Sequence, residues 1–194
     1  MNEVRLATQD DVDAIVSTVV DAFADDPAWA FIVGDDPEHR LAFARTLLLP
    51  RLALGTVWIV GDADAVAMWD RRGLTDPPDP LRDAAWRDYR GAVGEIAWEQ
   101  LEAYEDALGP LAPARPHWYL GVLATHPRAQ GRGLATAVLQ PGFSAAASDG
   151  WDCWLETSTT GNKAFYERRG FTGSRPITAP GFPPTWWLQR PHQA

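Results

Sequence analysis

The sequence predicts an α/β fold in which a mixed central sheet is flanked by helices. Strand-like and helix-like segments alternate through the last third of the chain, a pattern typical of strands joined by helical crossovers. Earlier, two apolar runs separated by a Gly61-Asp62 turn predict an antiparallel hairpin. With 194 residues and 46% hydrophobic content, the chain is long enough to bury a core, and we expect a single domain over residues 1–194.

The first half of the chain combines short apolar strands with amphipathic helices. Thr8 precedes a helical pattern that has Asp10 and Asp11 in its first turn, where carboxylates stabilise a helix N-terminus. The run Asp25-Asp26-Pro27 ends this helix. The other elements expected here are a strand over residues 3–7, a helix over 37–54, strands over 56–60 and 65–69, and a proline- and glycine-rich loop over 71–80.

The second half begins with one or two helices over residues 81–108, rich in charge and tryptophan, and a proline-rich connector over 109–116. A clear alternation follows. It predicts a strand over 117–125, a helix over 133–148, a strand over 151–156, a helix over 162–169, and a closing hairpin over 171–175 and 185–188.

Composition argues against several classes of function. The formal net charge of −9 argues against a nucleic-acid partner, because a phosphate backbone needs a basic surface, and it fits a cationic amine substrate. The single cysteine, Cys153, and the four scattered histidines show no metal-ligand spacing, so no metal is expected. No apolar run reaches the roughly 20 residues of a membrane helix, and the N-terminus has no signal pattern. We therefore expect a cytoplasmic protein that binds no membrane.

The most informative segment is Gln130-Gly131-Arg132-Gly133-Leu134-Ala135, which follows one predicted strand and opens a predicted helix. Its two glycines leave backbone N–H groups uncovered at a helix N-terminus, an arrangement that binds a pyrophosphate. The spacing is not that of a three-glycine dinucleotide turn, and no Gly-Lys-Ser/Thr follows as in a nucleoside-triphosphate loop. The alternative is a glycine-rich turn without a ligand.

This loop is one of four pieces that occur in order over residues 117–171. The others are the strand exit Leu123-Ala124-Thr125, the strand Trp154-Leu155-Glu156-Thr157, and the run from Asn162 through Phe165-Tyr166 to Gly170-Phe171. Together the four pieces resemble the GNAT N-acetyltransferases. The resemblance implies the GNAT fold, in which the mixed sheet contains two splayed parallel strands, and it implies acetyl-CoA as the cosubstrate.

Within that family, several segments resemble the puromycin N-acetyltransferases. They include Val4-Arg5-Leu6-Ala7-Thr8 near the start of the chain and Thr185-Trp186 near its end. Residues 70–115 match that group poorly. Because this segment borders the acceptor site in the implied fold, the resemblance fixes the acceptor less well than the cosubstrate.

The resemblance also implies where acetyl-CoA lies. The backbone of Leu123, Ala124 and Thr125 pairs with the pantetheine amides as an added strand would, and the N–H groups of the segment from Gln130 to Ala135 bind the pyrophosphate. Arg132 either adds a positive charge at the phosphates or is a solvated loop cation. Two residues of the next helix, Asn162 and Phe165, border the CoA arm, and the alternative for Asn162 is a helix N-cap.

Acetyl transfer needs a base for the amine and an acid for the departing thiolate. Tyr166 is in the position of the family's general acid, with a core tyrosine as the alternative. Many relatives carry a glutamate on the first central strand, where this chain has Tyr119. Glu156 on the next strand is therefore the candidate base, because burial raises the pKa of a carboxyl group toward neutrality. The alternatives are a structural role for Glu156 and a water relay.

The expected acceptor is the primary amine of a small amphipathic molecule such as a puromycin-like aminonucleoside, attacked directly in a ternary complex. Trp69, Trp118 and Tyr119 are candidates for stacking on it, with core packing as the alternative. Asp25 and Asp26 are candidates for attracting its ammonium group, with a solvated helix end as the alternative. The enzyme is expected to be a monomer or a homodimer.

Two other functions are compatible with the same segments. One is acetyl transfer to another amine, such as a polyamine or a protein N-terminus. The other is an acyl-CoA-binding sensor without turnover, against which Tyr166 argues.

Overall fold

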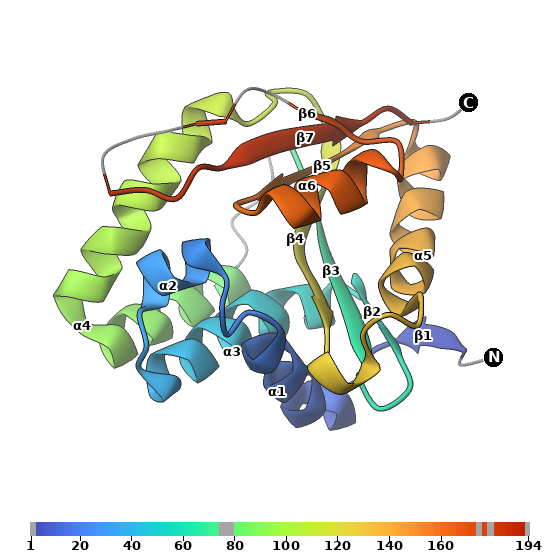
Figure 1. Cartoon of the computed structure of the whole chain (residues 1–194). Helices are drawn as coiled ribbons and strands as arrows, with labels where there is room; N and C mark the ends of the chain where they lie inside the picture. Colours follow the sequence, from blue (N-terminus) through green and yellow to red (C-terminus); the bar gives the residue numbers. More distant parts are fainter. Residues whose placement is uncertain (1–2, 74–79, 174–175, 178–180, 193–194) are drawn as a thin grey trace.

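The computed structural model describes residues 3–73, 80–173, 176–177 and 181–192, and a seven-stranded sheet lies at its centre (Figure 1). The strand order is β1-β2-β3-β4-β5-β7-β6. The strands are β1 (Val4–Leu6), β2 (Val57–Val60), β3 (Ala65–Arg72), β4 (His117–Thr125), β5 (Asp152–Thr157), β6 (Thr172–Gly173) and β7 (Trp186–Arg190). The pair β4–β5 is parallel, and the other neighbouring strands in this order are antiparallel. The mixed sheet predicted from the sequence is confirmed.

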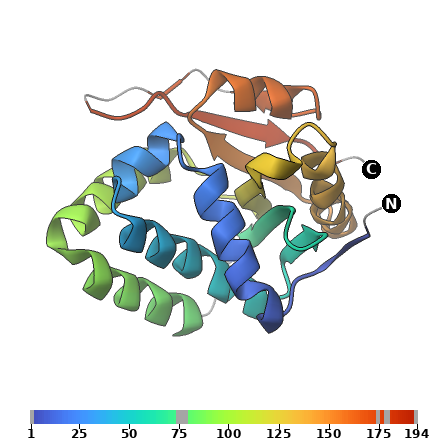
Figure 2. The same cartoon turned by 60° about the horizontal axis from the view of Figure 1, so that its bottom comes forward.

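Helices cover both faces of this sheet. The helices are α1 (Val12–Ala22), α2 (Pro27–Val33), α3 (Pro37–Ala53), α4 (Pro80–Leu108), α5 (Leu134–Asp149) and α6 (Thr160–Glu167), with 3₁₀ turns η1 (Gln9–Asp11), η2 (Gly109–Leu111) and η3 (Pro127–Ala129). One face packs against α1 to α4 and the other against α5 and α6. Figure 2 shows α4 running along the outside of α2 and α3, which it contacts.

Two elements differ from the sequence-based prediction. The short helix α2 was not predicted, although Asp26 caps it by accepting hydrogen bonds from the N–H groups of Ala28 and Trp29. Strand β3 continues to Arg72 instead of ending at residue 69. Helix α4 is kinked at Gly94, whose φ of 76° is not helical, and this agrees with the one or two helices predicted over residues 81–108. Residues 74–79 of the predicted loop and 174–175 of the predicted hairpin lie outside the described residues.

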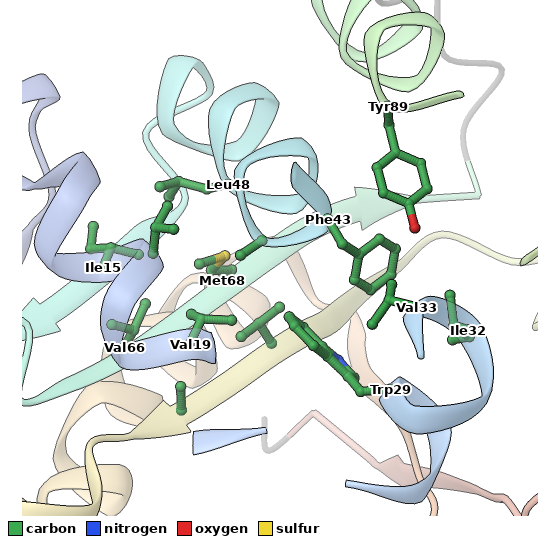
Figure 3. Packing of buried hydrophobic residues seen from close by; sticks show 14 of the residues in the cluster. Ile15, Val19, Trp29, Ile32, Val33, Phe43, Leu48, Val66, Met68 and Tyr89 are labelled. Atoms are coloured by element: carbon green, nitrogen blue, oxygen red, sulfur yellow. The ribbon is translucent and has the colours of Figure 1, made fainter. Parts of the chain in front are cut away.

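Side chains of the sheet alternate between two apolar cores. In β3, Val66 and Met68 point toward α1 and α3, whereas Ala67 and Trp69 point toward α5. Figure 3 shows the first core, where Trp29 of α2 lies below Phe43. The rings of Trp29 and Phe43 meet edge-on with centroids 5.1 Å apart. Burying each such side chain contributes about 1.5–3 kcal/mol, so this core fixes the helices on the sheet.

A β-bulge interrupts the pairing of β3 with β4. Met68 pairs with Val122 and the next residue, Trp69, pairs with Leu120, so Gly121 has no partner on β3. A bulge of one residue reverses which face the following side chains occupy. Val122 therefore lies in the core on the α1 side, whereas Leu120 lies in the core on the α5 side.

Helix α5 packs closely on the sheet because it has a glycine at the point of contact. A Cβ added to Gly142 would lie 2.3 Å from the Cε2 atom of Trp69, which is fully buried. Gly142→Ala is expected to lower the free energy of unfolding by about 1–3 kcal/mol, because overpacking of the Trp69 ring outweighs the better helix propensity of alanine. Urea denaturation followed by circular dichroism measures this change.

Gly91 provides the matched control, since it is an exposed helical glycine in α4 and an added Cβ meets no atom of the described residues within 4 Å. Gly91→Ala is expected to raise the free energy of unfolding by about 0.5–1 kcal/mol. If both substitutions stabilise the protein, the close packing of α5 on Trp69 is wrong.

Candidate active site

Two adjoining cavities open where the parallel strands separate. Within the described residues, β4 and β5 pair only at His117↔Asp152, Trp118↔Cys153 and Tyr119↔Trp154. Beyond Tyr119 the edge of β4 that faces β5 is therefore free to pair with a ligand. The loop-side cavity is lined by the glycine loop, α6 and the first turn of α5. The helix-side cavity lies between the sheet and helices α2, α3 and α4.

The glycine loop gives the loop-side cavity a surface of bare backbone. Gly131 has a φ of 75° and Gly133 a φ of 78°, a left-handed conformation that favours glycine. A Cβ added to either glycine would meet no atom within 4 Å in the described part of the chain, so the space beside the backbone is open. Gly133 is the N-cap of α5, whose positive helix end adds to the attraction for an anion. This arrangement fits the pyrophosphate of acetyl-CoA.

Most residues predicted to contact the cosubstrate line this cavity. They are Leu123, Thr125, Gln130, Gly131, Gly133, Leu134, Ala135, Asn162 and Phe165. Two do not. Ala124 has its side chain buried in the core against α1, and Arg132 is exposed outside the lining. The side chain of Thr159, not that of Asn162, caps α6 by accepting a hydrogen bond from the Asn162 N–H.

Arg169 lines the loop-side cavity and was not predicted from the sequence. Its guanidinium lies 3.4 Å from the ring centroid of Phe165 and donates to the Phe165 carbonyl oxygen at 2.7 Å. Arg169 Nε also donates to Thr136 Oγ1 on α5 at 3.1 Å. The guanidinium therefore ties α6 to α5 and brings a positive charge to the cavity wall. The four-residue spacing from Phe165 to Arg169, which lies in the turn directly after α6, was the available signal.

Tyr166 stands between the two cavities. Five residues line both of them: Phe23, Asp26, Leu123, Asn162 and Tyr166. Tyr166 is buried between the rings of Phe165 and Phe171. Burial raises the pKa of its phenol, and the charge of Asp26 raises that pKa further. The phenol is therefore neutral at pH 7 and holds a proton at the junction of the two cavities.

Glu156 lines the helix-side cavity with a buried carboxyl group. Burial raises its pKa to about 7, and the negative charge of Glu105 acts in the same direction. The positive charges of Arg72 and Arg51 oppose this rise. A carboxyl group with a pKa near 7 accepts and releases a proton at neutral pH, as a general base must.

The structure brings only part of the predicted acceptor set to this cavity. Tyr119 lines the helix-side cavity. Trp118 is adjacent to it on the same strand and must therefore face the opposite side of the sheet. Trp69 also lies on that side, where both tryptophans pack in the core with Phe143 of α5. Asp25 is exposed and outside both linings, whereas Asp26 lines both cavities.

The helix-side cavity contains charged and aromatic residues that sequence reasoning missed. The additional lining residues include Arg51, Asp70, Arg72, Trp86, Tyr104 and Glu105. Arg51 Nη2 donates to Asp70 Oδ2 at 2.6 Å, and Arg72 Nη2 lies 3.4 Å from the same oxygen. The Arg51 guanidinium lies against Gly121, where a Cβ would come within 2.5 Å of Nη2. The bulged glycine therefore makes room for this buried ion pair.

The described part of the chain contains no group of three or more His, Cys, Asp or Glu residues arranged to hold a metal ion. Among the same residues, each helix is too short or too polar to cross a bilayer.

Known proteins resemble this chain at the level of both sequence and fold. The Acetyltransferase (GNAT) family model matches residues 64–171. An uncharacterized N-acetyltransferase of Schizosaccharomyces pombe is 26% identical over 174 residues, which are 83% of this chain and 70% of that protein.

Two solved structures share the fold over nearly their whole length. Histone acetyltransferase HPA2 and related acetyltransferase from Corynebacterium glutamicum has a TM-score of 0.70 at 25% identity, covering 100% of this chain and 98% of that one. Arylalkylamine N-acetyltransferase 2 from Aedes aegypti has a TM-score of 0.71 at 13% identity, covering 98% and 99%. These comparisons do not support a particular closeness to puromycin N-acetyltransferases. The family match spans more than half of the chain and agrees with the splayed strands and the glycine loop, so the chain belongs to the GNAT acetyltransferase family, whose members use acetyl-CoA as acyl donor.

Proposed function

We propose that the protein transfers an acetyl group from acetyl-CoA to the primary amine of a small amphipathic molecule that carries an aromatic group. The observation that carries this proposal is the junction of the two cavities at Tyr166, with the glycine loop on one side and Glu156 on the other. Such a junction lets a thioester and an amine meet while both are shielded from water.

On the loop side, the chain's own groups would hold the cosubstrate. The backbone at Gly131 and Gly133 would bind the pyrophosphate, and the free edge of β4 near Leu123 would pair with the pantetheine amides. A backbone N–H near Leu123 would polarise the thioester carbonyl. Acetyl-CoA supplies the acetyl thioester, and the protein supplies position and proton transfer.

On the helix side, the Glu156 carboxylate accepts a proton from the substrate ammonium and releases the neutral amine. The amine nitrogen then bonds to the acetyl carbon while the carbon–sulfur bond breaks, and the Tyr166 phenol gives its proton to the departing sulfur. The second proton lost by the acetylated nitrogen restores the phenol. The products are an amide and a free thiol, with one proton left on Glu156.

The walls of the helix-side cavity favour an aromatic amine. Trp86 and Tyr104 contribute aromatic rings to the lining, and Glu105 and Asp26 contribute negative charge to it. An ammonium group gains from both the aromatic faces and the carboxylates. Puromycin carries a free α-amine next to an aromatic ring and fits this description, and so do arylalkylamines.

A panel of amines tests the acceptor class. With acetyl-CoA, puromycin and an arylalkylamine such as tryptamine are expected to gain one acetyl group on the primary amine. Their kcat/KM is expected to be at least about tenfold above that of spermidine or of a peptide N-terminus, because only an aromatic amine uses both the rings and the carboxylates. Thiol release gives the rates, and mass spectrometry identifies the products.

A charge variant sharpens the same test. Glu105→Gln is expected to raise KM for the preferred amine by about three- to tenfold, since an exposed carboxylate attracts the ammonium only modestly. Glu102→Gln is the matched control, because Glu102 is an exposed glutamate of the same helix outside the cavity lining. A preference for spermidine would reject the aromatic class. Acetyl-CoA binding without turnover of any amine would favour the sensor.

The glycine loop is tested by Gly133→Val, which places a branched side chain beside the proposed pyrophosphate position. Acetyl-CoA affinity is expected to fall at least tenfold, a change of about 1.4 kcal/mol, as measured by isothermal titration calorimetry. Gly150→Val controls for backbone strain, because Gly150 caps the other end of α5 with a φ of 69° and similarly open space. Equal affinities of the two variants would contradict the assignment of the loop.

The general acid is tested by Tyr166→Phe, which removes only the phenol oxygen. The expected result is a fall in kcat of roughly 10- to 10⁴-fold, because the thiolate then leaves without a proton donor. Acetyl-CoA binding should change little, since the ring that packs against Phe165 and Phe171 is retained. Full activity in this variant would show that the phenol is structural or that solvent protonates the sulfur.

A further inference from the structure

We propose that the preferred acceptor carries a carboxylate beside its primary amine, and that the Arg72 guanidinium binds this carboxylate in the helix-side cavity. This inference rests on the proposed function, because it narrows the class of aromatic amine that the same cavity accepts. The substrate class is then an aromatic amino acid or a similar zwitterion, and Arg72 is the residue that distinguishes it from a simple aromatic amine.

The lining of the helix-side cavity carries charged groups of both signs. The described lining includes arginines from three elements and acidic residues from four: Arg51, Arg72, Arg82, Asp26, Asp70, Glu105 and Glu156. Carboxylates alone would be enough to attract an ammonium group. Arginine side chains in the same wall favour a ligand that also carries negative charge, because the guanidinium is the group best suited to bind a carboxylate.

Asp70 is the carboxylate that two of these arginines share. Its Oδ2 atom accepts a hydrogen bond from Arg51 Nη2 at 2.6 Å, whereas Arg72 Nη2 lies 3.4 Å from the same oxygen. The short contact is a strong charge-assisted hydrogen bond and the long one is weak. Within the described part of the chain, Asp70 is also the only residue that forms an ion pair with Arg72. One negative charge thus serves two guanidinium groups, and Arg72 is the less neutralised of the two.

Arg72 also has the accessible surface that a binding residue needs. Its side chain is 39% exposed, whereas that of Arg51 is 8% exposed. The Tyr119 ring covers one face of the Arg72 guanidinium, with 3.6 Å between the guanidinium carbon and the ring centroid. Such a contact holds a guanidinium in one orientation. The N–H groups that Asp70 does not occupy are then available to a carboxylate, which a guanidinium binds through two parallel hydrogen bonds.

The acidic residues of the cavity favour a zwitterion over a simple anion. Glu105 of α4 and Glu156 of β5 line the same cavity as Arg72. They repel a carboxylate that arrives without an ammonium group, and Arg72 repels an ammonium group that arrives without a carboxylate. A ligand with both groups places each one against the opposite charge. The cavity therefore selects for the pair of charges and not for either charge alone.

A matched pair of acceptors tests the inference. Tryptophan and tryptamine share an indole ring and a primary amine, and only tryptophan has a carboxylate. With acetyl-CoA, kcat/KM for tryptophan is expected to be at least about tenfold above that for tryptamine, because only tryptophan gives Arg72 a partner. Thiol release gives both rates.

Three variants assign the preference to Arg72. Arg72→Gln is expected to lower the ratio of kcat/KM for tryptophan to that for tryptamine at least about tenfold, while Asp70 keeps its partner Arg51. Arg72→Lys should give an intermediate ratio, since a lysine keeps the charge without the planar fork. Arg71→Gln is the matched control, because Arg71 is the neighbouring arginine of β3, pairs with Asp149 and lies outside both cavity linings.

Binding supplies a readout that does not depend on turnover. Isothermal titration calorimetry of the enzyme saturated with CoA should show tryptophan binding at least about tenfold more tightly than tryptamine, with this advantage lost in Arg72→Gln and kept in Arg71→Gln. If tryptophan has this advantage but no amine is acetylated, the proposed function fails and the carboxylate site stands. Failure of tryptophan to bind, equal affinities for the two indoles, or a preference for tryptophan that survives in Arg72→Gln would overturn the inference.

Discussion

Strands β4 and β5 pair over three residues and then separate, and the loop-side and helix-side cavities open where they do. Parallel strands normally continue to pair until a loop ends one of them, since unpaired backbone groups are costly in a sheet centre. Here the unpaired edge of β4 faces a cavity instead of the core. The separation therefore leaves backbone groups of β4 without a partner strand, and an extended ligand with amide groups is suited to pair with them.

The bulge at Gly121 determines which side chains reach that opening. Before the bulge, Tyr119 faces the helices α2 to α4. After the bulge, Val122 and Ala124 face the same side, although each is an odd number of residues from Tyr119. Without the bulge, strict alternation would turn Val122 toward α5. The absence of a side chain at Gly121 also accommodates the Arg51 guanidinium. One glycine thus allows both an apolar core and a buried ion pair on the same face of the sheet.

Local patterns were sufficient to predict much of this structure. The strand over residues 117–125 and the glycine loop were found because alternation and glycine spacing are properties of short segments. Glu156 stood out as a carboxylate in an apolar strand. Contacts between distant segments were not accessible in this way. Arg51 of α3 and Asp70 of β3 form an ion pair between two separate elements. Glu105 reaches the cavity because α4 packs around α2 and α3, and the local sequence of α4 does not predict that packing.

The alternation of side chains along a strand corrects part of the predicted acceptor set. Trp118 and Tyr119 are adjacent residues of β4 and so lie on opposite faces of the sheet, which leaves only Tyr119 at the helix-side cavity. Asp25 was placed beside Asp26 as a charge at the helix end, but Asp26 begins a further helix whose N-cap turns its carboxylate inward. Burial then raises the pKa of Asp26 even though two backbone N–H groups and Ser158 bond to it.

The charges around Glu156 link the choice of substrate to the state of the base. Glu105 and Glu156 line one cavity, and the repulsion between them favours the protonated form of Glu156 when the cavity holds no cation. In the proposed function, a substrate ammonium that enters between them offsets this repulsion and stabilises the carboxylate. The same contact brings the ammonium to the group that must take its proton. An uncharged molecule of similar shape gains neither effect, so the pair of carboxylates selects amines at the step that activates them.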